Sequence, residues 1–255
     1  MSRLVYVHGG GGRIGRIRGL NQIGFSPLDL SPVAWWDGTD ASTMNTAADG
    51  SGSVPTSGQD VRRWEDKANG YLLTDQATRP PSLAAGGLSF DGTEDLVSTA
   101  AASVWAFLHG DPMACIVIPS SITTDGVVFT THSNNNTVKG ATLQKRGSNN
   151  RPLWLRSDGT STWITLEEVT DIWTNQAFGV VMDASRNLTL RLNNTSFDAG
   201  TEGDITGNPF NTLNFGADLA PGTSGAAGVY EHVILLDRAI TAGEWEQVLE
   251  WSGRS

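Results

Sequence analysis

The chain has 255 residues, of which 38% are hydrophobic, and a mean hydropathy of -0.21. No apolar run approaches the roughly 20 residues of a membrane-spanning helix, so a helical membrane protein is excluded. The formal net charge of -10 disfavours nucleic acid as a partner, because an acidic surface repels phosphate groups. We therefore expect a soluble protein that binds neither membrane nor nucleic acid and is large enough to fold around its own core.

Residues 1–28 differ in composition from the rest of the chain. They contain four arginines, seven glycines and no acidic residue, whereas all 27 acidic residues lie further along. Such a segment cannot bury enough apolar surface to fold alone. We interpret residues 1–28 as an extended anchoring arm and residues 29–255 as the folded domain. The residues expected to anchor the arm mix basic and aliphatic side chains: Arg13, Ile14, Arg16, Ile17, Arg18 and Leu20.

Two interpretations of the arm stay open. The segment can become ordered by docking in an acidic groove, on a sister subunit or on another protein, or it can be a solvated tail. Gly10–Gly15 also fits the G-x-G-x-x-G pattern of dinucleotide sites. That site needs a helix directly after the glycines, and two further glycines and Pro27 leave no stable helix there. We reject a nucleotide site.

For the folded domain, the sequence predicts a long loop over residues 38–60 followed by short strands separated by turns. Leucines occupy every second position of 188–193, and Asp158-Gly159 is a hairpin signal between two apolar segments. Continuous apolar runs at 113–118 and 178–182 predict strands deep in a sandwich. The predicted strands are 61–66, 71–74, 87–91, 95–98, 113–119, 126–131, 140–145, 152–157, 161–166, 177–183, 188–193, 211–216 and 228–237.

One helix is predicted, near the C-terminus. Thr241 and Glu244 form a capping-box pattern, in which each side chain accepts a hydrogen bond from the other residue's backbone amide. Ile240 and Trp245 stand where a hydrophobic staple would form. Many short strands and one short helix predict an all-β fold, an antiparallel two-sheet jelly-roll sandwich with an extended N-terminal arm.

Several motifs together carry a family resemblance. They are Trp36-Asp37 with Asp40, the segment 61–67 around Trp64, Arg79-Pro80 followed by 88–92, then 188–194, 213–216 and 228–245. Through them, residues 33–252 resemble concanavalin A-like, laminin-G-like jelly-roll domains. Domains with these motifs are similar to those of bacteriophage virion proteins, such as fibres, spikes and decoration proteins.

The resemblance implies a non-enzymatic structural protein of a phage particle. Such a protein would be made in the host cytoplasm without a signal peptide and held on the capsid or tail by its arm. Its expected partners are other virion proteins, sister subunits in a homo-oligomer, for which we expect a trimer, and a host-surface glycan. The leading alternative is a stand-alone carbohydrate-binding or adhesion module, and a glycoside hydrolase comes third.

Patterns for catalysis and metal binding are weak. A retaining glycosidase needs two carboxylates about 5–5.5 Å apart, hence acids at alternating positions of a strand, and we find no such pair. The four histidines, His8, His109, His132 and His232, lie far apart with no second ligand at metal spacing. We expect no cofactor and no metal. Calcium is kept as an alternative at two groups of acids, Asp91 with Glu94 and Asp95, and Asp198 with Glu202 and Asp204.

Glycan binding would use exposed aromatic side chains, which stack on sugar rings. Trp163 and Trp173 lie beside turns and are the first candidates, and Trp154 completes the group. The alternative is that these tryptophans belong to the core, since tryptophan is highly buried on average. Core positions are expected for Trp36, Trp64, Trp245 and the lone cysteine, Cys115.

Overall fold

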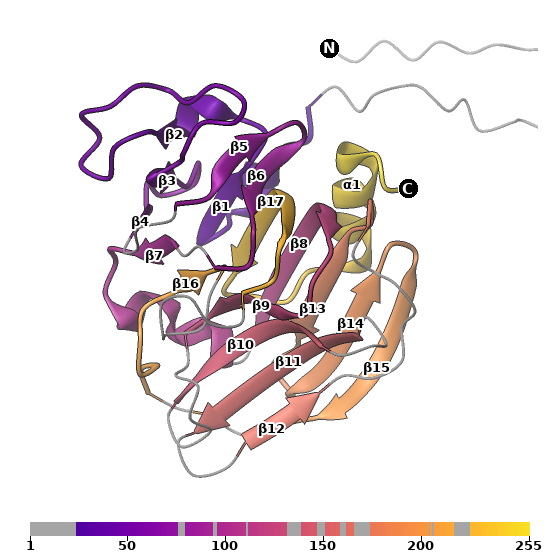
Figure 1. The fold of residues 1–255 in the computed structure, drawn as a ribbon. Helices are drawn as coiled ribbons and strands as arrows, with labels where there is room; N and C mark the ends of the chain where they lie inside the picture. The colour runs from indigo at the N-terminus through magenta and orange to yellow at the C-terminus, as the bar shows by residue number, and fades with distance from the viewer. Residues whose placement is uncertain are drawn as a thin grey trace, which may run out of the picture.

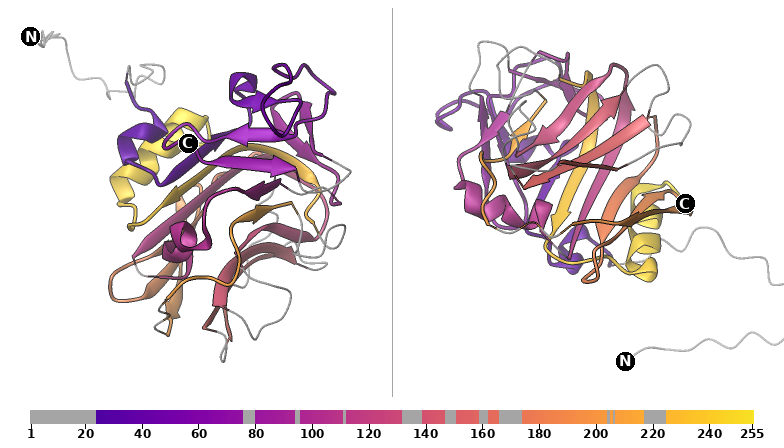
Figure 2. Two further views of the ribbon diagram at one scale, coloured as in Figure 1. Left: turned by 90° about the vertical axis from the view of Figure 1, so that its left-hand side faces the viewer. Right: turned by 90° about the horizontal axis from the view of Figure 1, so that it is seen from below.

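The chain folds into two antiparallel β-sheets packed face to face, with one short helix on the outer side of the first sheet (Figures 1 and 2). This computed structural model describes residues 24–75, 80–93, 96–110, 112–131, 139–146, 151–158, 162–165, 174–203, 205, 207–216 and 225–255. The predicted fold class is confirmed. Every strand predicted from the sequence overlaps an observed one, and the described residues contain no helix long and apolar enough to cross a membrane.

The first sheet has eight strands, and β17 is its central element. Along one side β17 pairs with β8, and along the other it pairs first with β6 and then with β1. In spatial order the strands are β15 (Thr195–Thr201), β14 (Asn187–Leu192), β13 (Phe178–Met182), β8 (Met113–Ile122), β17 (Gly228–Leu236), β6 (Gly87–Phe90) and β5 (Ser82–Ala84), with β1 (Ala34–Asp37) beside β17.

The second sheet has nine strands. In spatial order they are β12 (Thr162–Thr165), β11 (Arg151–Asp158), β10 (Lys139–Arg146), β9 (Gly126–Thr130), β16 (Asn214–Phe215), β7 (Leu96–Ser98), β4 (Leu72–Asp75), β3 (Arg63–Glu65) and β2 (Met44–Asn45). The predicted hairpin at Asp158-Gly159 is present as the antiparallel pair of β11 and β12.

The strand register of the second sheet explains why its inner face is apolar. Residues directly opposite one another on neighbouring strands lie on the same face of a sheet. One such row crosses five strands and consists entirely of buried apolar side chains, which pack against the first sheet. The row is Leu96, Phe215, Phe129, Leu143 and Trp154.

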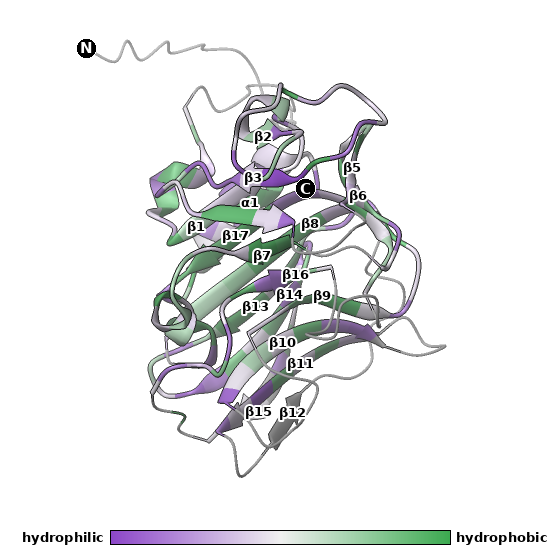
Figure 3. Cartoon of the chain, turned by 60° about the vertical axis from the view of Figure 1, so that its left-hand side comes forward, coloured by the Kyte–Doolittle hydropathy of each residue, from purple (hydrophilic) through white to green (hydrophobic). Residues whose placement is uncertain are grey.

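Strands β8 and β13 are apolar on both faces because each face has its own core (Figure 3). In β8, Cys115 and Val117 enter the core between the sheets, whereas Ile116 and Ile118 enter a second core. That second core lies beneath helix α1 (Ala242–Ser252). The continuous apolar runs in the sequence thus reflect a central sheet covered on both sides, and the predicted core position of Cys115 is confirmed.

Helix α1 begins as its sequence predicts. The Thr241 hydroxyl accepts a hydrogen bond from the Glu244 amide, and the Glu244 carboxylate accepts one from the Thr241 amide. Ile240, Trp245 and Val248 are buried in the second core. The helix ends at Gly253, whose φ of 71° is in the left-handed region that favours glycine.

The chain enters the domain through a short 3₁₀ helix, η1 (Pro27–Leu30), capped by Ser26. Pro27 and Leu30 are buried, and Phe25 packs against the second core. We call residues 25–30 the arm root. The first four of its residues fall within the predicted arm, yet they contact the folded domain. Residues 1–23, with all six predicted anchoring residues, lie outside the described residues.

The sequence did not predict four of the strands or any of the three 3₁₀ helices, η1 included. Strands β2 and β5 have only two and three residues, and β15 is a polar edge strand with a bulge opposite Leu188 and Thr189. The other 3₁₀ helices are η2 (Ala41–Thr43) and η3 (Ala102–His109), and η3 has no side-chain cap. Strand β1 carries the motif Ala34-Trp-Trp-Asp37, in which all four residues are buried and no alternation is visible.

Helix α1 should require glycine at position 179 of β13, because the Trp245 ring of the helix packs directly against this position. A Cβ atom at this position would come within 2.8 Å of the Trp245 ring, which is itself fixed by a 2.6 Å hydrogen bond from its Nε1 to the Asn193 carbonyl. We expect Gly179→Ala to lower the free energy of unfolding by about 1–3 kcal/mol, measured by urea denaturation.

Gly243→Ala is the matched control. Gly243 lies in the first turn of α1, where an added methyl group would meet no atom within 4 Å outside the helix's own backbone. Alanine there should leave stability unchanged or raise it by up to about 1 kcal/mol. Equal stability of Gly179→Ala and the wild-type protein would contradict the close packing of the Trp245 ring on Gly179.

Candidate functional site

Arg238 connects the arm root to helix α1. Its guanidinium donates to the Leu30 carbonyl at 3.0 Å and to both carboxylate oxygens of Glu244 at 2.7 and 3.1 Å. The hydrogen bond from Arg238, together with those from Thr241, lowers the pKa of Glu244 to about 2. Arg238 follows β17 by two residues, so one side chain joins the arm root, the helix start and the central strand.

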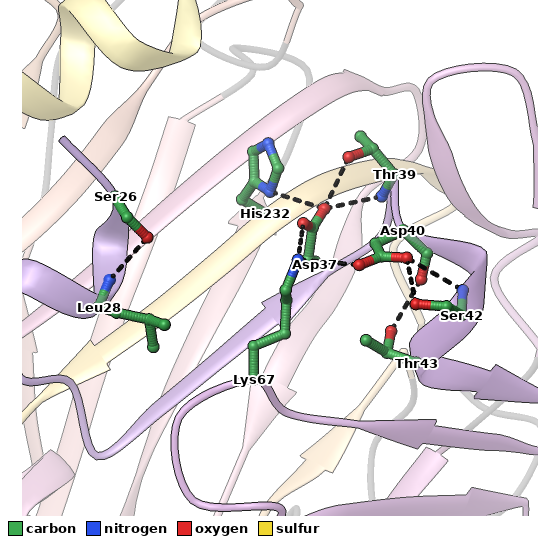
Figure 4. A network of polar contacts seen from close by, with 9 residues as sticks. All are labelled: Ser26, Leu28, Asp37, Thr39, Asp40, Ser42, Thr43, Lys67 and His232. Atoms are coloured by element: carbon green, nitrogen blue, oxygen red, sulfur yellow. Dashed lines mark hydrogen bonds and ion pairs between the residues drawn. The ribbon is translucent and has the colours of Figure 1, made fainter. Parts of the chain in front are cut away.

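A polar network joins β1, β17 and the loop after β3 (Figure 4). The Lys67 ammonium bridges two carboxylates, at 3.0 Å from Asp37 and 2.9 Å from Asp40. The other oxygen of Asp37 accepts hydrogen bonds from the amide and hydroxyl of Thr39 and lies 3.2 Å from the His232 Nδ1 atom. We call these five residues the Asp37 network.

Aromatic side chains cover one side of the network. The ring of His232 lies 4.5 Å from that of Trp251 in α1, and Trp251 meets Trp35 edge to face at 5.9 Å. The Lys67 ammonium also lies 4.7 Å from the Trp35 ring centre, a cation–π contact. The network therefore packs on the helix as well as on the strands.

The chemistry of the Asp37 network is structural: its ion pairs and hydrogen bonds hold β1, β17 and the loop after β3 together. Burial raises the pKa of Asp37, but the nearby His232 side chain and hydrogen bonds from Thr39 and Lys67 outweigh that effect and hold this pKa well below its usual range. The Thr39 hydroxyl donates to Asp37, so within the network His232 has no nucleophile to activate. The space between the two carboxylates holds the Lys67 ammonium, and no group of metal-ligating side chains occurs among the described residues.

Sequence reasoning missed this network because its members are distant along the chain. Asp37 and His232 are opposite one another in the antiparallel pairing of β1 with β17, a contact that no local pattern reveals. A signal was nevertheless present: Trp36-Asp37 with Asp40, and the closing segment with His232, are two of the motifs that carry the family resemblance.

The structure separates the three tryptophans proposed for glycan stacking. Trp154 is fully buried and packs edge to face on Phe129, so the proposal that Trp154 stacks on a sugar is corrected. The register places its side chain on the inner face of the second sheet. Trp163 lies on the edge strand β12, opposite Arg156, and its side chain is not among the described ones. Trp173 lies outside the described residues.

The acids considered for calcium have other partners where they are described. Glu202 pairs at 2.7 Å with Arg156, a fully buried arginine that also donates to the His109 carbonyl. Asp91 accepts from Thr93, and Asp198 accepts from the Gly200 amide. Glu94, Asp95 and Asp204 lie outside the described residues.

No protein-family model and no curated protein matches the sequence. Similar solved structures include that of botulinum neurotoxin type C, which interacts with two ganglioside molecules (TM-score 0.57, 8% identity, 89% of this chain and 53% of that chain). Another is the binding domain of botulinum neurotoxin DC in complex with rat synaptotagmin II (TM-score 0.53, 9% identity, 74% and 49%). A third is the Trypanosoma rangeli sialidase (TM-score 0.50, 14% identity, 75% and 31%).

At these identities the similarities establish the fold. A similar fold occurs in a neurotoxin binding domain and within a larger sialidase chain. The chain spans about half the length of the neurotoxin structures that it matches.

The arm root should lose stability in acid through Glu244. A carboxylate with a pKa of about 2 in the folded state and near 4.5 when unfolded stabilises the fold above pH 4.5, and this contribution is lost as the pH falls towards 2. Glutamine can still accept the capping hydrogen bond. We expect Glu244→Gln to cost about 1 kcal/mol at pH 7, and the difference from wild type to shrink towards pH 2, measured by urea denaturation across pH. A difference that is constant with pH would contradict the ion pair.

The Asp37 network should depend more on Asp37 than on Asp40. The Asp37 side chain is 8% exposed and holds three partners, whereas that of Asp40 is 33% exposed. We expect Asp37→Asn to lower the free energy of unfolding by about 1–3 kcal/mol and Asp40→Asn by less than about 1 kcal/mol. Thermal and urea unfolding of both variants provide the comparison, and the reverse order would refute this account of the network.

Proposed function

We propose that this chain is a non-enzymatic structural protein of a bacteriophage particle. Its residues 1–28 hold it on the particle and on sister subunits in a trimer, and its lectin-like sandwich is displayed for attachment to a host-surface glycan. The family resemblance of residues 33–252 suggests the phage particle, and the described structure supports the division into an anchor and a displayed domain.

The observation that carries the proposal is the construction of the arm root. Pro27 and Leu30 are buried, and Arg238 ties the root to α1 beside the central strand β17. The arm would thus be attached beside β17, the strand that is paired on both of its edges. Strand β12, which carries Trp163, is the edge strand at the far end of the second sheet (Figures 1 and 2). The arm root and the candidate glycan-binding strand therefore lie at opposite ends of the described domain.

The chemistry of the described residues supports a binding role. The Asp37 network pairs each of its carboxylates with a cation and contains no activated nucleophile. The buried Glu202 carboxylate is paired with Arg156. Neither arrangement resembles two free carboxylates facing each other across a substrate.

Removal of residues 1–23 tests the anchor. This boundary spares the buried Pro27 and Leu30, so we expect a deletion variant with the unfolding midpoint of the full-length protein and no incorporation into particles. Replacement of Arg13, Arg16 and Arg18 by alanine keeps the length of the arm and removes three of its positive charges. This variant tests whether the charges are needed, and we expect it to reduce incorporation as well. Normal occupancy of particles by the deletion variant would overturn the anchor.

A glycan array tests the displayed face. We expect the isolated domain to bind a glycan and to lose about tenfold or more in affinity on Trp163→Ala or Trp173→Ala, as for an aromatic side chain central to a binding site. Trp154→Phe is the control: it keeps a buried aromatic ring and should leave affinity unchanged. Absence of binding to any glycan would remove host-surface glycans from the proposal.

A stand-alone carbohydrate-binding or adhesion module is the second candidate. It is favoured by the similarity to the neurotoxin structures, one of which interacts with gangliosides and another of which is in complex with rat synaptotagmin II. Binding to glycans by a protein that never joins particles would support this candidate. Release of free sugar from any bound glycan would instead identify a hydrolase, as in the similar sialidase.

A further inference from the structure

Phe210 is the one strongly exposed aromatic residue in the part of the chain that the structure describes. It is 63% exposed, and the other large apolar residues with high exposure, Leu28 and Val54, are aliphatic. Phenylalanine is among the residues most often fully buried, because its ring is a large apolar surface. A phenyl ring left in solvent therefore points to a contact that the isolated chain does not make.

The backbone around Phe210 is fixed by hydrogen bonds. The Phe210 amide donates to the Lys139 carbonyl at the start of β10 at 2.8 Å, and the Asn211 amide donates to the Thr131 carbonyl at 3.2 Å. The Thr212 hydroxyl then donates at 2.7 Å to a backbone carbonyl just before η3. A ring carried on a fixed backbone loses little conformational freedom when it binds a ligand, which favours binding.

Polar groups lie close to the ring. Gly207 and Asn208, shortly before Phe210, are both exposed. The Lys139 ammonium lies 3.2 Å from the place that a Cβ atom of residue 207 would occupy. An aromatic surface with a few hydrogen-bonding groups beside it is the typical composition of a site for a small polar ligand.

The ring lies at the end of the second sheet where β12 begins. Lys139, whose carbonyl accepts from Phe210, is opposite Asp158 at the end of β11. The residue before it, Ser157, is opposite Thr162, the first residue of β12 (Figure 1). The backbone register thus places Phe210 near the edge strand that the proposed function assigns to glycan binding.

We infer that the Phe210 ring stacks on one pyranose ring of the bound glycan. This rests on the proposed glycan-binding function and names the residue on which the sugar lies. The C–H groups on one face of a pyranose form an apolar surface that packs on a phenyl ring. The hydroxyl groups at the edge of the sugar can exchange hydrogen bonds with the ammonium of Lys139 and the amide of Asn208.

The size of the apolar surface favours a sugar over a sister subunit. A stable protein interface buries about 800 Å² on each partner and has an apolar core. The exposed neighbours of Phe210 described above, Gly207 and Asn208, add no apolar side chain to such a core. A single phenyl ring matches a single pyranose in area.

The experiment measures the binding of lactose, cellotriose, maltotriose and chitotriose to the full chain by saturation-transfer NMR. We expect at least one probe to bind, with the strongest saturation on the C–H groups of one face of a sugar ring. Phe210→Leu keeps an apolar side chain and should lower the affinity about tenfold or more, as for an aromatic side chain central to a binding site. Phe210→Tyr keeps the ring and should bind as the wild type does.

Two controls exclude other causes. Val54→Ser removes an exposed apolar side chain elsewhere and should leave the affinity unchanged. Since Phe210 is exposed, both of its variants should keep the urea unfolding midpoint of the wild-type protein.

The outcomes separate this inference from the proposed function. Unchanged affinity in Phe210→Leu, or equal losses in Phe210→Leu and Phe210→Tyr, would overturn the stacking role and leave glycan binding in place. A change of oligomeric state in Phe210→Leu, measured by light scattering, would identify a subunit contact and overturn it as well. Binding of none of the probes would also overturn it, and a negative glycan array would overturn glycan binding as a whole.

Discussion

Strand β17 is the element on which the rest of the structure depends. It pairs with β8 along one side and with β6 and β1 along the other, so its backbone is hydrogen-bonded on both edges. Its side chains alternate between two cores, with Val233 and Leu235 facing the second sheet and Ile234 and Leu236 facing helix α1. Loss of packing on either side of this strand would therefore weaken both cores.

The position of β17 explains why the arm root is placed where it is. An anchoring segment is useful only if the domain does not unravel at its point of attachment. Here η1 enters the second core, Arg238 holds the Leu30 carbonyl, and the Asp37 network joins β1 to β17. Polar and apolar contacts thus tie the start of the domain to its last strand and helix. In the proposed function, the second sheet with its edge strand β12 would carry the displayed surface.

The fold could be predicted because its signals are local. Alternation in 188–193, the capping box of Thr241 and Glu244 and the hairpin at Asp158-Gly159 each involve residues close in sequence, and each is present in the structure. Strand β15 was missed because a polar edge strand buries little and shows no apolar period. The second core was also missed, since its helix, strands and arm root come together only in three dimensions.

The candidate sites were harder to predict, for the same reason. Trp154 and Trp163 look alike in the sequence, yet the register buries Trp154 among core residues and places Trp163 on an edge strand.

The central claim is that residues 1–28 assemble the protein while the sandwich folds independently. Light scattering of the full-length protein and of the variant without residues 1–23 tests it most directly. The account predicts a trimer for the full-length protein and a folded monomer for the variant. The same oligomeric state for both would contradict the arm as the contact between subunits.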